Sequence, residues 1–263
     1  MNRSMHLSLN EIWVVRHWDL IKLLTINDLK IKYQHTYIGL IWSLLSPLIL
    51  LIVLYFIFYS IRHLEANFAQ YLLVGILTWR FFTNATNSSV TVIKQKAALL
   101  ENIVLPAEIF VLTKNLSALI SFTLEFVILI PLVALITGSV SPYALLFPFI
   151  HILFLLITFG LSLILACLYP YFRDLAEIWP FVIQIGFFLC PIIYPISIIP
   201  ESVRGLYLLN PVTQIMIMYR DLVLHGVLPA FASLIYILLF GTGICIAGHF
   251  LFKRLERRFV EVI

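Results

Sequence analysis

Charged residues are scarce in this chain: Asp, Glu, Lys and Arg together make up 11% of its 263 residues. A soluble domain averages about 25% charged residues, so too little polar surface is present to face water on all sides. Hydrophobic residues make up 62% of the chain, and the mean hydropathy is +1.04. The composition therefore excludes an ordinary soluble domain and predicts a protein surrounded by lipid.

Several functional motifs are also missing. Cys167, Cys190 and Cys245 each stand in an apolar run without CxxC spacing, which argues against disulfides and a cysteine-bound metal. No GxxxxGK[ST] phosphate loop is present, so the chain is not expected to hydrolyse ATP itself. The first residues, MNRSMHLSLNEIW, lack a compact apolar core followed by a small-residue cleavage site. We therefore expect no cleaved signal peptide.

Long apolar runs dominate the rest of the sequence. About 20 apolar residues span a bilayer as a helix, whereas the strands of a membrane barrel are short and alternate in hydrophobicity. We therefore predict an all-α integral membrane protein in which residues 1–263 form one transmembrane domain. The six expected transmembrane helices cover residues 38–60, 69–92, 115–137, 143–169, 176–196 and 229–251.

The distribution of Lys and Arg predicts the orientation in the membrane. If the N-terminus is cytosolic, most of the 17 basic residues lie on the cytosolic side, and only Arg62, Arg204 and Arg220 lie outside. We therefore predict a multi-pass protein of the cell inner (plasma) membrane with both termini in the cytosol. The basic cluster KRLERR at residues 253–258 is expected to attract anionic membrane lipids.

Two segments are predicted to lie at the membrane surface without crossing it. Within the cytosolic stretch 1–33, residues 9–26 place apolar and charged side chains on opposite arcs of a helix, as in an amphipathic interface helix; a helix packed on a soluble partner is the alternative. Residues 197–226 are apolar but interrupted by charges, each costing about 2.5–3.5 kcal/mol in a continuous span. We expect two short re-entrant half-helices there, meeting at Asn210 and Pro211 on the outer side between the fifth and sixth spans, or else an ordinary outer loop.

Two ionisable residues lie deepest inside the predicted spans. Arg80 and Glu125 are each roughly 12 residues from the expected outer end of their span, which places both about 18 Å below that surface. An unpaired charge at that depth is costly, so a buried ion pair between the second and third spans is expected. Alternatively, Arg80 lines a wet pore and Glu125 faces another polar group.

Two tyrosines share one face of the first predicted span and would contact a molecule that moves through the bundle. Tyr55 and Tyr59 fall on one stripe of the first span with Leu48 and Ile52, and phenol rings suit the apolar faces of sugars while their hydroxyls exchange hydrogen bonds. The alternative is an aromatic belt at the membrane interface. At the cytosolic end of the fourth span, the neighbours Arg173 and Asp174 are expected to bond separate partners.

Seven segments of the sequence follow one another in a characteristic order: NDLKIKYQHTYIGLIWSLLSPL (27–48), GILTWRFFTNATNSS (75–89), LLENIVLPAEIFVL (99–112), YFRDLAEI (171–178), FFLCPIIYP (187–195), LNPVTQIMIMYRDLVLHG (209–226) and FKRLERRFVEVI (252–263). In this order they resemble the membrane subunit of ABC-2 type exporters, specifically the branch that exports O-antigen, capsular polysaccharide and teichoic acid. The resemblance covers nearly the whole chain.

The resemblance implies a permease that carries a lipid-linked polysaccharide from the cytosol to the outer side of the membrane. It further implies two copies of this chain and two copies of a nucleotide-binding ATPase subunit, which holds ATP and Mg; no cofactor is expected on this chain, and no nucleic acid among its partners. Residues 94–108 would form the cytosolic coupling segment that contacts the ATPase. The residues assigned to that contact are Glu101, Asn102, Pro106 and Glu108; helix capping and solvation between two spans are the alternative. Trp42 joins the two tyrosines on the substrate path, and Asn210, Pro211 and Arg220 form an outer gate.

Three other functions remain as alternatives. Export of a small hydrophobic molecule or drug uses the same fold, but the 197–226 segment and the short first outer loop favour polysaccharide. A membrane glycosyl or acyl transferase would need converging acid and base groups, and the acidic residues here are scattered singly while no His residues approach metal-ligand spacing. A secondary transporter would show an internal repeat, and none is evident.

Overall fold

The protein is a bundle of α-helices. The computed structural model describes residues 17–34, 39–59, 67–102, 105–137, 141–256 and 259, and no β-strand occurs among them. Residues 9–16 of the predicted interface helix 9–26 lie outside the described residues, whereas residues 18–26 belong to α2. The longer helices are α2 (Trp18–Gln34), α3 (Gly39–Tyr59), α4 (Phe68–Val90), α7 (Glu108–Thr137), α8 (Phe147–Leu168), α9 (Leu175–Leu189) and α12 (Phe231–Glu256).

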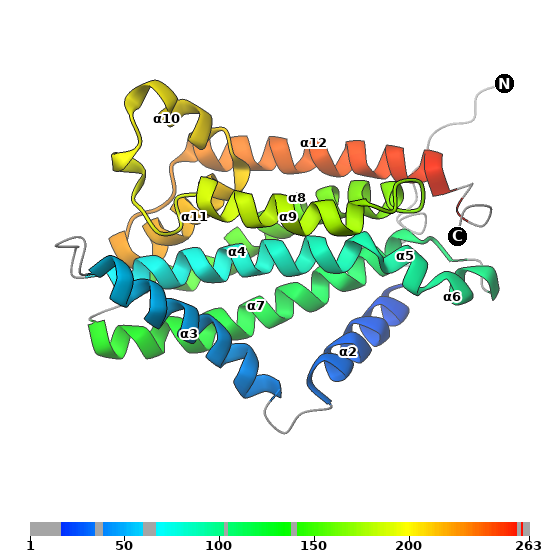
Figure 1. Cartoon of the computed structure of the whole chain (residues 1–263), viewed down its shortest axis with the longest axis horizontal. Coiled ribbons are helices and arrows are strands. Elements are labelled where there is room, and N and C mark those ends of the chain that lie inside the picture. Colours follow the sequence, from blue (N-terminus) through cyan, green and yellow to red (C-terminus); the bar gives the residue numbers. More distant parts are fainter. Residues whose placement is uncertain are drawn as a thin grey trace.

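Short helices occupy the two ends of the bundle. At one end, α5 (Val92–Gln95) and α6 (Ala97–Asn102) precede α7. At the other end lie α10 (Glu201–Leu208) and α11 (Pro211–Arg220), followed by a π-helical turn, η4 (Asp221–His225). Figure 1 shows α5, α6 and the C-terminal end of α12 at the same end of the molecule, opposite α10 and α11. Two short 3-10 turns, η2 (Pro142–Leu146) and η3 (Ile196–Ile198), precede α8 and α10.

Among the described residues, four helices are long and apolar enough to cross a membrane: α3, α7, α8 with its preceding turn, and α12. The other two expected spans correspond to α4 and α9. Helix α4 has 23 residues, but its second half, FTNATNSS, is polar. Helix α9 has only 15 residues. Pro191 and Pro195 follow its end, and proline disfavours continuation of a helix because it lacks a backbone N–H and its ring clashes with the preceding turn.

Helix α4 lies at the centre of the bundle. It contacts α3, α7, α8, α9 and α11, and Figure 1 shows it running between α9 and α7. Every residue from Leu72 to Trp79 is buried. By contrast, Ile183 is the only buried residue of α9, and Phe181 and Phe188 of that helix are more than 60% exposed. The apolar core therefore surrounds α4, while the outer helices expose apolar side chains on the outer surface of the bundle.

Glycines allow α8 and α12 to pack closely. A Cβ atom on Gly160 would lie 2.6 Å from the backbone nitrogen of Cys245, and one on Gly248 would lie 2.6 Å from the carbonyl oxygen of Gly160. Both contacts are with backbone, which cannot give way cheaply. Small residues at such positions let membrane helices approach each other, and these two helices form the most extensive helix pair in the fold.

The segment between α9 and α12 contains two short helices that meet at Asn210. The Asn210 side chain accepts a hydrogen bond from the Val212 nitrogen at 2.9 Å, and Pro211 occupies the first helical position, where its missing N–H is harmless. No residue of α10 is buried, whereas α11 buries Ile215, Met216 and Tyr219 fully. The break between a surface helix and a core helix therefore falls at the Asn-Pro pair.

Candidate functional site: a polar groove along α4

A stripe of polar side chains runs along one face of α4 and continues into α5. Its members recur at intervals of three and four residues, which places them on one side of a helix. They are Arg80, Thr83, Asn84, Asn87, Ser88, Thr91 and Gln95. Each is at least partly exposed, whereas the intervening Phe81, Phe82, Ala85 and Thr86 are buried. From Leu72 to its end, this central helix is therefore open only along its polar face.

Three cavities follow this stripe and share its residues. They have volumes of about 540, 510 and 430 Å³. Asn84 lines all three, Arg80 lines the second and third, and Lys32 lines the first and second. Together they form a groove along α4, which we call the α4 groove. Its other walls come from α2 and α7 at one end and from α3 and α9 farther along.

The structure brings Arg80 and Glu125 together in the middle of the groove. Arg80 Nη2 lies 3.3 Å from Glu125 Oε1, and Arg80 Nε lies 3.5 Å from Oε2. Arg80 Nη1 also donates to Ser46 Oγ of α3 at 3.1 Å. The Glu125 side chain is 4% exposed and that of Arg80 27%. The guanidinium therefore satisfies a buried carboxylate and still borders the open groove.

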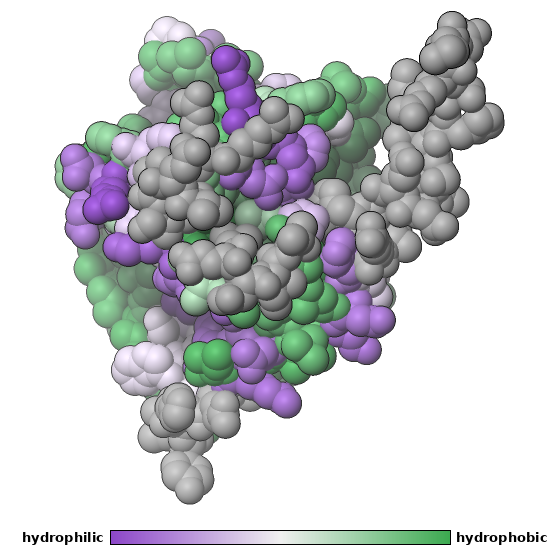
Figure 2. Space-filling model, turned by 90° about the vertical axis from the view of Figure 1, so that its right-hand side faces the viewer, coloured by the Kyte–Doolittle hydropathy of each residue, from purple (hydrophilic) through white to green (hydrophobic). Residues whose placement is uncertain are grey.

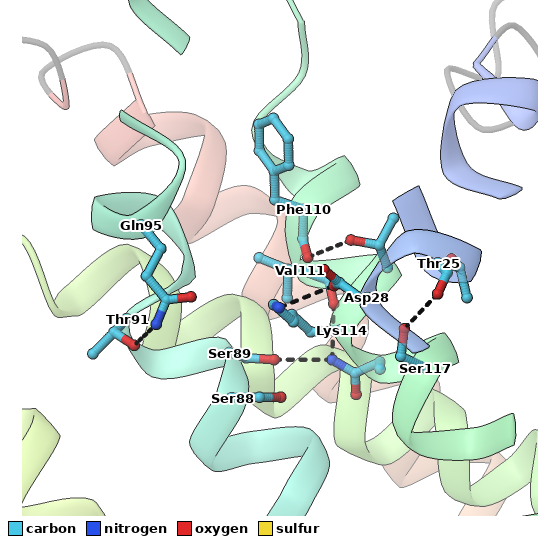
Figure 3. Close-up of polar contacts among 12 residues, drawn as sticks. Thr25, Asp28, Ser88, Ser89, Thr91, Gln95, Phe110, Val111, Lys114 and Ser117 are labelled. Atoms are coloured by element: carbon cyan, nitrogen blue, oxygen red, sulfur yellow. Dashed lines mark hydrogen bonds and ion pairs between the residues drawn. The ribbon is translucent and has the colours of Figure 1, made fainter. Parts of the chain in front are cut away.

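Lysines gather at the groove end formed by α2, α5 and α7. Lys114 Nζ pairs with Asp28 Oδ2 at 2.9 Å, and Lys32 Nζ donates to Ser121 Oγ at 2.9 Å. Lys96 lines the same cavity. Figure 3 shows Gln95 donating to Thr91 on one side of the cavity, and Lys114 beside Asp28 on the other. This end of the groove carries hydroxyl, amide and ammonium groups that can donate hydrogen bonds.

The aromatic residues expected on the substrate path do not form one cluster. Trp42 is 60% exposed and lines the second cavity. The ring of Tyr55 lies 6.1 Å from that of Phe68 and packs against the apolar core. The Tyr59 side chain lies outside the described part of the structure. Of these residues, the described structure places Trp42 alone on the α4 groove.

The coupling segment is joined to the end of α12 by polar contacts. The Glu108 side chain is 0% exposed; its Oε1 lies 2.6 Å from His249 Nδ1 and its Oε2 lies 3.5 Å from Lys253 Nζ. The Ala107 nitrogen donates to Glu256 Oε1 at 2.9 Å. Pro106 is partly exposed, and the side chains of Glu101 and Asn102 lie outside the described residues. The Glu108 carboxylate therefore points into the bundle and is not available as a surface contact in this conformation.

Residues expected to form the outer gate have separate structural roles. Arg220 is 3% exposed, donates to the carbonyls of Pro191 at 2.7 Å and Ile192 at 3.1 Å, and lies 3.4 Å from the centre of the Tyr71 ring. This geometry permits a cation–π contact. Arg220 thereby joins α11 to α4 and to the turn after α9, whereas Asn210 and Pro211 start α11.

Arg173 and Asp174 lie in the turn between α8 and α9. Both are exposed, and neither belongs to an ion pair within the described part of the chain. They lie at the bundle end that includes α5 and α6, which Figure 2 views directly and where hydrophilic residues gather. In the described ranges, no three His, Cys, Asp or Glu side chains come close enough to hold a metal ion.

Sequence reasoning missed three features of this site. The first is the polar stripe of α4, which the spacing of Thr83, Asn84, Asn87 and Ser88 could have revealed. The second is the lysine-lined cavity, whose residues come from helices far apart in the chain. The third is the link between Glu108 and His249, which are 141 positions apart. No local signal predicts the second or the third.

Comparison with known proteins identifies the family. A family model described as ABC-2 type transporter matches residues 19–224. The chain is 28% identical over 250 residues to the O-antigen export system permease protein RfbA of Klebsiella pneumoniae, covering 94% of this chain and 95% of that protein. It is 27% identical to the RfbA protein of Myxococcus xanthus, covering 90% and 92%, and 24% identical to the polysialic acid transport protein KpsM of Escherichia coli, covering 90% and 93%. The chain therefore belongs to the ABC-2 type transporter family.

Proposed function

We propose that this chain is the membrane-spanning permease subunit of an ABC exporter that moves a lipid-linked polysaccharide from the cytosol to the outer side of the inner membrane. The observation that carries the proposal is the α4 groove, because a polar stripe on the central helix of a membrane bundle requires an aqueous or glycan-filled path. The names of the relatives, O-antigen and polysialic acid transport proteins, support a polysaccharide as the substrate.

Two copies of the chain would enclose the path. The α4 groove is open on one side in a single copy, and its Arg80, Thr83 and Asn84 would otherwise face hydrocarbon, where polar groups are costly. The same grooves from two copies would face one another across a shared pore. In this arrangement α3, α4, α7, α8, α9 and α12 are the six membrane-spanning helices of each copy. Trp42 of α3, which lines the groove, would contact sugars along the way.

A separate ATPase would supply the energy. The docking surface in this proposal is the segment 94–108, which includes α6 and the end of α5. Its contact residues are Glu101, Asn102 and Pro106, while Glu108 anchors the segment to α12. Arg173 and Asp174 add an exposed polar turn at the same end. The lysines of this end support a cytosolic location. In this proposal both chain termini lie in the cytosol, and α10–α11, with Asn210, Pro211 and Arg220, form an outer re-entrant gate. ATP and Mg would bind to the partner.

The decisive experiment reconstitutes the permease with its nucleotide-binding partner in proteoliposomes. We expect two differently tagged copies of the chain to copurify with the ATPase, and ATP hydrolysis to rise when a lipid-linked glycan is added. The lipid carrier without glycan should stimulate less. Stimulation by small hydrophobic molecules but not by the glycan would overturn the proposed substrate.

Groove variants provide a matched test within the same preparation. Asn84→Leu should reduce glycan export at least about tenfold, because an apolar side chain at the residue common to all three cavities removes a hydrogen-bonding partner and narrows the path. Leu135→Ala on α7, where the side chain is 86% exposed and apart from the groove, is the control and should leave export unchanged. Equal export by the two variants would contradict a path along α4.

A further inference from the structure

The lysine-lined cavity at the α2 end of the α4 groove has the charge and location of an anion site. We propose that it binds the phosphate or diphosphate headgroup of the lipid carrier, before the glycan enters the groove. This inference rests on the proposed function, since it specifies how a lipid-linked substrate is held. It assigns Lys32 and Lys96 as the residues that contact the headgroup.

The charges of the cavity are not balanced. Its lining includes Lys32, Lys96 and Lys114 but one carboxylate, Asp28, which gives a formal charge of +2. Asp28 neutralises Lys114 through the 2.9 Å pair. No carboxylate of the described ranges forms an ion pair with Lys32 or Lys96. Two ammonium groups are therefore left to attract an anion.

Neutral donors surround the two lysines. Asn84 and Gln95 line the same cavity of about 540 Å³. Each amide NH2 has two donors, of which Gln95 uses one on Thr91 Oγ1, so amide hydrogens remain for a phosphate oxygen. Lys32 Nζ uses one donor on Ser121 Oγ, and an ammonium group has three. The other two donors of Lys32 can bind the oxygens of a multivalent anion. Hydrogen bonds to a charged acceptor are stronger than those to a neutral one.

The position of the cavity favours a lipid rather than a soluble anion. Helix α2, which forms one wall, exposes Trp18, Leu23 and Ile31 by 54–63%, as expected for a helix lying at the membrane interface. The cavity also shares Lys32 and Asn84 with the next cavity, which Trp42 and Arg80 line. A headgroup at Lys32 would lie at interface depth, with its hydrocarbon tail in the bilayer and its glycan directed along the polar stripe.

Binding of defined ligands to the full chain in phosphatidylcholine nanodiscs tests the inference. The probe is a long-chain polyprenyl diphosphate, and the comparison ligands are the uncharged polyprenol, phosphatidylglycerol and inorganic diphosphate. We expect the polyprenyl diphosphate to bind at least about tenfold more tightly than each comparison ligand. Equal binding of phosphatidylglycerol would indicate general attraction to anionic lipid, and equal binding of inorganic diphosphate a soluble-anion site; either result overturns the inference.

Lysine variants locate the site. Lys32→Ala and Lys96→Ala should each weaken binding about tenfold, since each removes a hydrogen bond to a charged group, and Lys32→Arg with Lys96→Arg should retain it. Lys94→Ala is the matched control, because Lys94 is exposed in α5, two residues before Lys96, but does not line the cavity. The size-exclusion profile of each variant reports folding. Unchanged binding in the folded double alanine variant would overturn the assignment.

The result is separable from the proposed function. ATPase copurification and glycan-stimulated hydrolysis test the exporter, whereas the nanodisc measurement needs neither the ATPase nor a glycan. If the chain copurifies with an ATPase and exports glycan but the lysine variants bind the polyprenyl diphosphate normally, the headgroup site is wrong and the exporter stands. If the diphosphate binds at the lysines but no ATPase associates, the exporter fails and the site stands.

Discussion

Removing Arg80 should destabilise the protein more than removing Glu125. The two side chains pair at 3.3 Å between α4 and α7, but Glu125 is 4% exposed and Arg80 27%. In Arg80→Leu, a buried carboxylate loses its partner, which typically costs 3–5 kcal/mol. In Glu125→Leu, the guanidinium keeps Ser46 Oγ at 3.1 Å and its contact with the groove. We expect the free energy of unfolding of Glu125→Leu to fall by about 1–3 kcal/mol.

The double variant separates the pair from its parts. Arg80→Leu with Glu125→Leu leaves no unpaired charge and should recover most of the loss, because well-packed apolar residues often replace a buried pair at little cost. With a residual loss of about 1 kcal/mol in the double variant, the expected coupling free energy is about 3–7 kcal/mol, a large fraction of a stability of about 5–15 kcal/mol. The exchange Arg80→Glu with Glu125→Arg should also recover part of it.

Equilibrium unfolding of the detergent-solubilised chain measures all four states of this cycle. Tryptophan fluorescence is a suitable probe because Trp79 is buried and directly precedes Arg80 in α4. Equal losses for the two single variants would contradict the burial argument. Losses that simply add in the double variant would show that the two groups do not interact, and would refute the pairing as a source of stability.

Three further predictions concern packing and anchoring. Gly160→Leu should abolish the folded yield or lower stability by more than about 3 kcal/mol, because its side chain would meet the α12 backbone; Gly243→Ala, which has open space, should be tolerated in the same thermal-unfolding assay. Glu108→Gln should lower the free energy of unfolding by about 1–3 kcal/mol, because it removes the charge that His249 and Lys253 contact. Glycan-stimulated ATP hydrolysis should fall in this variant while basal hydrolysis is unchanged. An unchanged ratio of the two rates would contradict a link through α12. Arg220→Leu should lower stability by about 3 kcal/mol or more, since it leaves buried carbonyls without donors, whereas Arg220→Lys should recover part of the loss; indistinguishable melting temperatures would refute this anchoring role.

Features that depend on short stretches of sequence were accessible without the structure. The apolar runs of α3, α7, α8 and α12 predict helices of membrane length, because the transfer free energy of a span is a sum over its own residues. The break at Asn210 and Pro211 was also predictable from local sequence, since capping and the missing N–H of proline act within a few residues. The depth of Arg80 and Glu125 sufficed to suggest that they pair.

Directions of side chains were decided only by the tertiary structure. Glu108 follows a predicted surface segment, yet α12 covers it and supplies His249 and Lys253. Arg220 is a charged residue in an outer segment by sequence, but α4 and the turn after α9 enclose it. A helix's sequence specifies which residues share a face, whereas the rotation of that helix and the identity of its neighbours arise from packing between distant segments. Composition and hydrophobic runs alone thus determined that this protein is a helical membrane protein, and the packing around α4 decided which polar residues line its groove.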